Sequence, residues 1–274
     1  MLQKCRESPV KRKLTVITTT PDRIPDVPIL EIRAMSKVFH VNGEFVNVLG
    51  DIHLSVQKGE FVCLMGRSGC GKTTLLNILA GFIPPSSGVA EIHGELICRP
   101  GPDRCVVFQE DALFPWLTVF ENVAFGLRVL KKSRKKIRNE VMDMLAETGL
   151  NEFRDYLPGE ISGGMKQRVA LARVLILRPN VLLMDEPFAA LDAQTREEMQ
   201  KLLLQLWRSL SHTVVFVTHD VEEALTLADR ILIMEKNPGR IRHEMDVSLE
   251  RPRKKGETRR FLLSQKIHEY LSNQ

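Results

Sequence analysis

The stretch GRSGCGKTT, residues 66–74, decides the fold of this chain. It fits the pattern G-x-x-x-x-G-K-[ST], follows the apolar run FVCLM and opens the helical run LLNILAGF. Its glycines let the backbone approach phosphate groups closely, at a helix N-terminus that already favours anions. Lys72 would reach the β and γ phosphates of a nucleotide, and the Thr73 hydroxyl would ligate Mg²⁺. The residues expected to line the nucleotide are Gly66, Arg67, Ser68, Gly69, Cys70, Gly71, Lys72, Thr73 and Thr74.

Short apolar runs recur from Ile29 onward, and each ends in a polar or glycine-rich break. They are FVCLM before Gly66, CVVF before Gln109, VLLM before Asp185, VVFVT before His219 and ILIM before Glu235. Continuous rather than alternating runs are typical of strands buried on both faces, hence of a largely parallel sheet. Helical patterns lie between the runs, which predicts a doubly wound α/β fold. Residues 110–176 supply helical patterns without a convincing strand, so they are expected to form a helical insertion.

Polar side chains follow several of these runs, where the carboxyl ends of parallel strands place ligand sites. Asp185 suits a Mg²⁺ ligand, and the adjacent Glu186 is free to act as general base on an attacking water. Gln109 offers an amide that can touch both metal and water, and His219 can hydrogen-bond a γ-phosphate. Singly, Gln109 and His219 would be ordinary loop residues. A P-loop alone does not separate kinases, GTPases and ATPases, but together the four predict a nucleotide-hydrolysing site.

Composition excludes several classes of protein. The 274 residues carry a net charge of +5, and the basic residues cluster at 4–13, 131–138 and 251–260 rather than on one aromatic-studded face. We interpret these clusters as solvated surface and expect no nucleic-acid partner. No apolar run is long enough for a membrane span or a signal peptide, and the five cysteines lack zinc-type pairing. The sequence therefore indicates a cytoplasmic protein with reduced thiols.

The two ends of the chain differ from its middle. Residues 1–28 show no helical or strand periodicity and are expected to form a disordered extension. Residues 250–274 begin with the basic run RPRKKGETRR and end in a pattern typical of a short helix. The apolar positions of that pattern are Leu263, Ile267, Tyr270 and Leu271.

With these motifs the chain resembles the ATP-binding subunits of ABC transporters. The order of motifs in that family is Walker A, Q-loop, signature, Walker B, D-loop and H-loop. All six occur here in order, as GRSGCGKT, Gln109, ISGGM, LLMDEP, ALD (residues 190–192) and His219. The resemblance implies ATP and Mg²⁺ as cofactors, with Thr73, Gln109 and Asp185 around the metal.

The resemblance also implies a division of the chain. An ABC ATPase domain would span residues 29–249, with a P-loop NTPase (RecA-like) α/β core and a mostly parallel sheet over 29–109 and 177–249. An antiparallel β subdomain would lie near the N-terminus. The helical subdomain would span 110–176.

The signature ISGGM is the motif that would bind ATP on a second chain. In the family, two subunits pack head to tail, so that Ser162, Gly163, Gly164 and Met165 of one, with Asp192 of its D-loop, complete the phosphate site of the other. A serine hydroxyl, glycine N–H groups and a helix N-terminus together make an anion site. Without the other motifs, a plain helix cap and turn would be the better interpretation.

Two positions depart from the family or leave alternatives open. Met165 stands where the family usually has Gln, and a thioether cannot donate a hydrogen bond to a ribose. The family also places an aromatic side chain against adenine ahead of the P-loop. Phe39 is the candidate here, with His40 second.

Three phrases narrow the resemblance to the ATPases of nitrate, sulfonate and taurine importers. They are VVFQEDALFPWLTVFENVAFGL, DEPFAALDAQTR and ADRILIMEKNPGRI. Phe114 and Trp116 would lie near a groove that receives a cytoplasmic helix of an integral-membrane permease. The implied complex is a homodimer, or a pair with a like subunit, on the cytoplasmic face of the inner membrane, with an external solute-binding protein.

The transported solute is left open by these residues, because specificity belongs to the permease and the solute-binding protein. A different small-molecule importer stays an alternative. A non-transport ABC ATPase is disfavoured, because only about fifty residues separate Gln109 from the signature, too few for long coiled-coil arms.

Overall fold

The structure is a computed structural model that describes residues 27–110, 112–210, 212–253 and 256–272. Of the extension expected at the N-terminus, residues 1–26 lie outside the described residues. Among the helices that the structure describes, none is long and apolar enough to cross a membrane.

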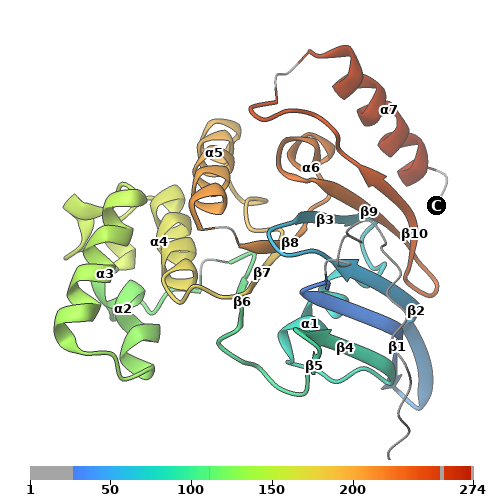
Figure 1. Cartoon of the computed structure of the whole chain (residues 1–274), viewed down its shortest axis with the longest axis horizontal. Coiled ribbons are helices and arrows are strands. Elements are labelled where there is room, and N and C mark those ends of the chain that lie inside the picture. Colours follow the sequence, from blue (N-terminus) through green and yellow to red (C-terminus); the bar gives the residue numbers. More distant parts are fainter. Residues whose placement is uncertain (1–26, 111, 211, 254–255, 273–274) are drawn as a thin grey trace, which may run out of the picture.

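Over the described residues the chain begins with three strands, and strands and helices alternate between residues 181 and 235, after three consecutive α-helices (Figure 1). The strands are β1 (Leu30–Val41), β2 (Glu44–Val56), β3 (Phe61–Gly66), β4 (Ser87–Ile92), β5 (Glu95–Leu96), β6 (Arg104–Val107), β7 (Val181–Asp185), β8 (Thr213–Val217), β9 (Arg230–Glu235) and β10 (Arg240–Asp246). The α-helices are α1 (Lys72–Ala80), α2 (Val119–Val129), α3 (Arg134–Glu147), α4 (Gly163–Leu175), α5 (Ala193–Leu210), α6 (Val221–Leu227) and α7 (Thr258–Ser272). Two short 3₁₀ turns, Asn151–Phe153 and Pro158–Glu160, lie between α3 and α4.

A six-stranded sheet forms the centre of the molecule, in the order β10-β9-β3-β8-β7-β6. The pairs β9-β3, β3-β8, β8-β7 and β7-β6 are parallel, and only β10 runs antiparallel to its neighbour. Every residue of β3 and of β8 is buried. This confirms the parallel sheet predicted from continuous apolar runs, because strands covered on both faces need no polar positions.

A second, antiparallel sheet has the order β2-β1-β4-β5. Asn42 and Gly43 connect β1 to β2 with positive φ angles of 52° and 88°. A two-residue turn with both φ angles positive matches the twist of antiparallel strands. The antiparallel β subdomain expected near the N-terminus is therefore confirmed, and Figure 1 shows it beside α1.

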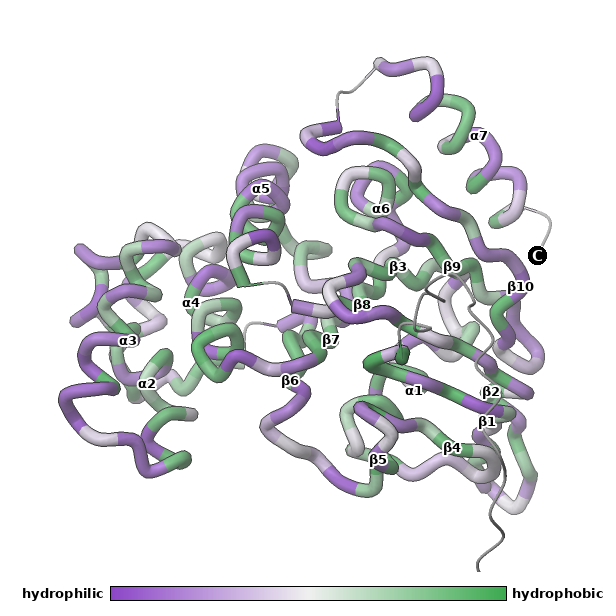
Figure 2. The backbone as a smooth tube through the Cα atoms, in the orientation of Figure 1, coloured by the Kyte–Doolittle hydropathy of each residue, from purple (hydrophilic) through white to green (hydrophobic). Residues whose placement is uncertain are grey.

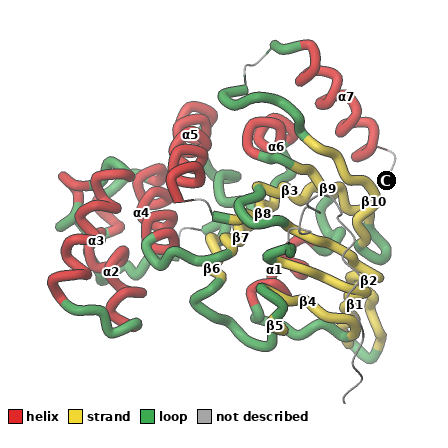
Figure 3. The backbone as a smooth tube through the Cα atoms, viewed as in Figure 1, coloured by secondary structure: helices red, strands yellow, loops and turns green. Residues whose placement is uncertain are grey.

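Helices α2, α3 and α4 lie together at one side of the molecule, away from the antiparallel sheet (Figures 1 and 3). Thr118 caps α2 and forms a reciprocal capping box with Glu121. In α3 the buried positions form one stripe, while the rest of the helix is largely hydrophilic (Figure 2). Those buried positions are Ile137, Val141, Met144 and Leu145.

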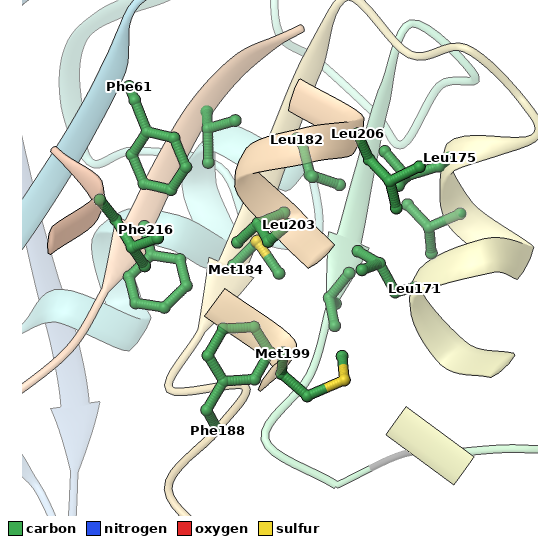
Figure 4. Close-up of a cluster of buried hydrophobic side chains, with 14 of the residues drawn as sticks. Phe61, Leu171, Leu175, Leu182, Met184, Phe188, Met199, Leu203, Leu206 and Phe216 are labelled. Carbon is green, nitrogen blue, oxygen red and sulfur yellow. The ribbon is translucent and has the colours of Figure 1, made fainter. Parts of the chain in front are cut away.

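The main hydrophobic core joins the parallel sheet to α4 and α5 (Figure 4). The side chains labelled there are Phe61, Leu171, Leu175, Leu182, Met184, Phe188, Met199, Leu203, Leu206 and Phe216. Met199, Leu203 and Leu206 are buried at helical spacing on α5 and anchor that helix to the sheet. Truncating one buried Leu to Ala in such a core costs about 2–5 kcal/mol.

Helix α7 packs back onto α6 near the sheet edge formed by β10 (Figure 1). Ile267 is fully buried, and the buried Arg260 guanidinium lies 2.8 Å from Oε2 of Glu222 on α6. The ring of Tyr270 stacks on His243 of β10, with ring centroids 3.7 Å apart. These contacts fix α7 to the core along its length.

Candidate nucleotide-binding site

The loop between β3 and α1 carries three glycines with positive φ: Gly66 at 155°, Gly69 at 79° and Gly71 at 97°. Left-handed backbone of this kind favours glycine. At Gly71, moreover, an added Cβ would lie 2.5 Å from the Leu49 side chain of β2. The loop therefore needs glycine for its conformation and for its close approach to the antiparallel sheet.

Helix α1 begins without a capping side chain and has no acidic residue in its first turn. By contrast, Thr118, Ser133, Ser162 and Asp220 each cap a helix with a side-chain oxygen. Uncapped N–H groups at a helix N-terminus carry partial positive charge and suit an anion. The start of α1 thus fits a phosphate group, as the sequence predicts.

Lys72 lies across this loop. Its side chain is buried, and Nζ donates to the carbonyl oxygens of Gly66 at 2.8 Å and Arg67 at 3.3 Å. A third contact, at 4.0 Å, is to the Cys70 sulfur, and none of the three is to a carboxylate. The ammonium charge therefore stays available for an incoming phosphate at the same loop.

Asp185 ends β7 within reach of the first turn of α1. Its carboxylate accepts a hydrogen bond from the Thr73 hydroxyl. Burial raises the pKa of Asp185, and the Thr73 hydrogen bond and the nearby Lys72 offset only part of that effect. A hydroxyl and a carboxylate oxygen side by side are ligands that Mg²⁺ prefers.

Among the described residues, no group of three or more His, Cys, Asp and Glu side chains gathers as a metal cluster. Mg²⁺ is commonly held by one or two protein oxygens together with phosphates and water. The pair of Thr73 and Asp185 fits that mode rather than an all-protein metal cage.

Glu186 and His219 meet at the same edge of the sheet. The strands β7 and β8 are parallel neighbours with Asp185 opposite Val217, so the residues that follow them are also adjacent. The Glu186 amide donates to the Val217 carbonyl at 3.0 Å, and Glu186 Oε2 lies 2.8 Å from His219 Nδ1. Glu186 has a φ of 44°, an uncommon left-handed backbone for a non-glycine residue. Such strain is held in place only by surrounding contacts and is typical of functional sites.

The remaining candidates near the nucleotide differ in their surroundings. Gln109 is exposed in the segment after β6, and the structure places no hydrogen-bond partner on its side chain among the described residues. Ser68 is exposed, Thr74 is half-buried and Cys70 is buried. Burial raises the pKa of the Cys70 thiol, which keeps it protonated and unreactive despite the nearby Lys72.

The aromatic candidates lie at the end of the β1–β2 hairpin. Phe39 is half-buried, and Lys37 Nζ lies 4.9 Å from its ring centroid. The His40 ring instead packs against Phe45, with centroids 5.2 Å apart. Phe45 is 80% exposed and was not singled out from the sequence, although an aromatic residue next to a glycine turn is a signal that could have found it.

The signature residues border a different groove from the P-loop. Ser162 is the N-cap of α4, and its Oγ accepts from the Met165 amide at 3.3 Å. A groove of about 430 Å³ is lined by Gly149, Phe153, Ser162, Gly163, Gly164, Met165, Arg168, Ala190, Leu191, Asp192, Thr195 and Glu198. No residue of the P-loop lines this groove, so one chain does not bring its signature to its own phosphate loop.

Glycine is required at one signature position and leaves space at the other. A Cβ on Gly164 would lie 2.6 Å from the Thr195 side chain, whereas a Cβ on Gly163 would meet no atom within 4 Å. Asp192 caps α5 and accepts from the Thr195 hydroxyl at 2.6 Å, which lowers the pKa of its carboxyl. The groove therefore has open backbone at Gly163 and a fixed carboxylate at Asp192.

Sequence reasoning missed the polar side chains that support these loops. The buried Gln167 of α4 donates to the Pro187 carbonyl at 2.6 Å, which ties the signature helix to the loop after Glu186. Glu223 and Arg196 contact Thr218 and Asp220, the residues on either side of His219. A glutamine inside the apolar run of α4 is a signal for Gln167, because a buried amide needs a partner.

An apolar groove of about 480 Å³ lies between the helical region and the segment around Gln109. It is lined by Phe82, Pro102, Cys105, Val106, Phe108, Ala112, Phe114, Phe125, Gly126, Val129, Leu130, Arg173, Val174 and Leu177. The Phe114 ring lies 4.6 Å from that of Phe125, and the buried Asn122 amide accepts from the Phe114 N–H and donates to its carbonyl. The wall of the groove is thus held by both packing and hydrogen bonds.

Three features together define a P-loop ATPase. They are a phosphate-binding loop between a strand and a helix, a hydroxyl-carboxylate pair for a divalent cation, and a carboxylate-imidazole pair. Comparison with known proteins gives the family. Residues 49–189 match the family described as ABC transporter. The bicarbonate transport ATP-binding protein CmpD of Synechocystis sp. is 45% identical over 247 residues, covering 89% of this chain and 88% of the relative.

Two further proteins, one relative and one solved structure, are also similar to this chain. The taurine import ATP-binding protein TauB of Pelagibacter ubique is 50% identical over 205 residues, covering 75% of this chain and 77% of the relative. The dimeric post-hydrolysis structure of the ATP-binding cassette MJ0796, bound to ADP and Pi, has a TM-score of 0.71 and 31% identity. That similarity covers 81% of this chain and all of the cassette. The chain belongs to the ABC transporter family and is an ATPase of that family.

Proposed function

We propose that this chain is the ATP-hydrolysing subunit of an importer for a small anion or an organosulfonate. The observation that carries the proposal is the pairing of Glu186 with His219 beside the P-loop, while Ser162 and Asp192 border a separate groove. The first arrangement is suited to hydrolysis. The second is suited to a nucleotide held by another copy.

Binding would begin at the start of α1. The phosphates would be held by the P-loop N–H groups and Lys72, and Thr73 and Asp185 would hold Mg²⁺, which neutralises charge on the β and γ phosphates. Gln109 would reach the same metal and the water. Phe39 would stack on adenine through its ring face.

Hydrolysis would use Glu186 as general base. A water oxygen forms a bond to the γ-phosphorus, the bond to the β–γ bridging oxygen breaks, and the water proton passes to the Glu186 carboxylate. With Nδ1 protonated, His219 donates to Glu186 Oε2 and fixes the direction of the other carboxylate oxygen. When the imidazole is protonated at both nitrogens, its Nε2 would donate to the γ-phosphate from the same position at the sheet edge.

A second copy would complete the site. In a head-to-tail dimer, Ser162, the Gly163 and Gly164 amides and the N-terminus of α4 would face the partner's γ-phosphate, with Asp192 beside them. Met165 contributes only its amide, which already donates to Ser162 Oγ. The dimeric ADP-bound structure of the cassette MJ0796 supports this arrangement by similarity.

The apolar groove would receive a cytoplasmic helix of an integral-membrane permease. Its rim carries exposed apolar side chains at Phe108, Phe125, Val129 and Leu130, and Trp116 beside it is 71% exposed. Exposed apolar side chains that lie side by side are typical of protein contacts. Such a contact would place the subunit at the cytoplasmic face of the membrane, with a solute-binding protein on the other side of the complex.

We propose the same division of the chain that the motifs imply. The ATPase domain would cover residues 29–249, with the core at 29–109 and 177–249 and the helical subdomain at 110–176. The basic segment 250–274, which contains α7, would follow the domain. The names of the relatives CmpD and TauB, for bicarbonate and taurine, support a small anion or sulfonate as solute.

The test compares purified protein with intact cells. Purified wild-type chain is expected to release phosphate from ATP only when Mg²⁺ is present, and absence of hydrolysis would reject the ATPase site. Cells carrying Glu186→Gln in place of the wild type are expected to lose uptake of one labelled solute among taurine, other sulfonates, nitrate and bicarbonate. Unchanged uptake of all of them, with normal hydrolysis by wild-type protein, would reject this importer class and favour one for another small molecule.

A further inference from the structure

Helix α5 connects two segments that belong to different halves of the proposed site. We call residues 190–192 the Asp192 loop and residues 218–220 the His219 turn. Asp192 caps α5 through the Gln194 and Thr195 amides, so the loop and the first turn of the helix move as one piece. The His219 turn follows β8 and carries the imidazole that contacts Glu186.

Arg196 bridges the two segments. One guanidinium nitrogen donates to the Leu191 carbonyl at 2.9 Å, and the other lies 3.4 Å from Oδ2 of Asp220. A guanidinium presents several donors in a rigid fork, so a single side chain can hold two acceptors at a fixed separation. A lysine ammonium on a flexible stem has no such fork.

The His219 turn is held from its other side as well. The Asp220 amide donates to the Thr218 hydroxyl at 3.0 Å, and that hydroxyl donates to Glu223 Oε2 at 2.6 Å. Gln200 lies one helical turn after Arg196 on α5 and donates to Glu223 Oε1 at 3.2 Å. Arg196 and Gln200, one helical turn apart on the same face of α5, therefore both hold the His219 turn in place.

These contacts surround Glu186 and His219, the proposed catalytic pair. A small cavity of about 30 Å³ is lined by Glu186, Phe188, Ala189, Arg196, Thr218, His219, Asp220 and Glu223. Thr218 and Glu223 are almost fully buried, so their hydrogen bonds are shielded from water. The imidazole of His219 is itself mostly exposed, and its Nδ1 lies 2.8 Å from Glu186 Oε2.

We propose that Arg196 is a positioning residue that holds the His219 turn and the Asp192 loop in one arrangement. The inference rests on the proposed function, because it assigns His219 to the chain's own ATP and Asp192 to the partner's. Loss of γ-phosphate at His219 would shift the turn, and Arg196 would pass that shift through the Leu191 carbonyl to Asp192. The two ATP sites of a dimer are then linked through α5.

The test uses variants that separate positioning from folding. Arg196→Ala removes both contacts and Arg196→Lys removes the fork. Asp220→Asn keeps Oδ1, which caps α6 by accepting from the Glu222 and Glu223 amides, but replaces the oxygen that faces Arg196 with a donor. Arg208→Ala, at an exposed position on the same helix, is the matched control.

The expected result is a fall in kcat of about tenfold for Arg196→Ala and Asp220→Asn, with KM for ATP and Tm nearly unchanged. Arg196→Lys is expected to recover only part of the loss, and Arg208→Ala to behave as wild type. The double variant Arg196→Ala/Asp220→Asn is expected to be no slower than the slower single variant, because both remove one interaction.

Three results would overturn the inference: a kcat of Arg196→Ala equal to that of wild type, additive losses in the double variant, or losses matched by a lower Tm. Each of them presupposes that wild-type protein hydrolyses ATP. A wild-type protein without activity would instead contradict the proposed function, so the two failures are distinguishable.

Discussion

Oε2 of Glu186 lies 2.8 Å from Nδ1 of His219, although 33 residues separate the two along the chain. The contact is fixed by the backbone, because β7 and β8 are paired and the Glu186 amide donates to the Val217 carbonyl. The carboxylate is therefore oriented by the fold itself. A base that is already oriented loses little entropy when the reaction begins.

Replacement of Glu186 by Gln is expected to abolish hydrolysis while ATP binding is kept. The amide keeps the shape and a hydrogen bond to His219 but cannot accept the water proton, and loss of a general base typically costs about 100-fold or more in rate. With ATP no longer cleaved, the dimer is expected to accumulate. Phosphate release and size-exclusion chromatography with ATP measure the two effects.

Glu147→Gln is the control for that substitution, because Glu147 is exposed at the end of α3 and belongs neither to the P-loop nor to the residues that line the signature groove. It is expected to hydrolyse ATP at the wild-type rate. Turnover by Glu186→Gln at the control rate would remove Glu186 from the role of base.

Ser162→Arg is expected to lower hydrolysis by about tenfold or more without weakening ATP binding to isolated monomers. The large cation would occupy the groove at the start of α4, where the partner's phosphate is proposed to sit. Loss of the helix cap alone costs about 1 kcal/mol of stability.

Ser133→Arg separates the two effects, because Ser133 caps α3 in the same way, with its Oγ 3.3 Å from the Lys136 amide. It is expected to lose similar stability yet to hydrolyse ATP normally. Equal activity of the Ser162 and Ser133 variants, or weaker ATP binding by the Ser162 monomer, would contradict a site shared between chains.

The parallel sheet was predictable because burial on both faces leaves continuous apolar runs in the sequence. The same runs predicted which polar residues would stand at the carboxyl edge, and Asp185, Glu186 and His219 do stand there. The antiparallel sheet was expected only from the family resemblance. Its strands mix buried and exposed positions and contain irregular register, as between Ile32 and Met35, so no clear period marks them.

Two of the supporting contacts were not predictable, because their partners are main-chain oxygens. Arg196 and Gln167 contact the carbonyls of Leu191 and Pro187, and every residue type carries a carbonyl. Nothing in the sequence marks which carbonyl faces a side chain. The contact of the Arg67 side chain with the Leu271 carbonyl at the end of α7 joins segments 204 residues apart and is invisible for the same reason.

Val129→Glu is expected to prevent copurification of the chain with its permease while hydrolysis by the isolated subunit stays within about twofold of wild type. Val129 is 64% exposed on the rim of the apolar groove, and a carboxylate there would be buried unpaired by a docked apolar helix. Affinity purification from detergent-solubilised membranes measures the effect.

The control is Leu262→Glu, at an exposed apolar position of α7 outside the groove, and this variant should copurify normally. Intact complexes with Val129→Glu would exclude the groove as the docking surface.

Glu223→Gln is expected to gain thermal stability relative to wild type as the pH rises. Burial is the main cause that raises the pKa of Glu223 above its ordinary 4.5, and the Thr218 and Gln200 hydrogen bonds offset only part of it. The folded state therefore binds this proton more tightly than the unfolded state does.

The resulting stability is fully present below about pH 4.5 and is lost as the pH rises through the raised pKa. The loss is about 1.4 kcal/mol for every tenfold difference in proton affinity between the folded and unfolded states. Glutamine stays neutral throughout, so the Tm difference between variant and wild type should increase as the pH rises above about 4.5. Glu147→Gln should show no such trend, and a flat difference for Glu223→Gln would mean that the fold does not raise the pKa of Glu223.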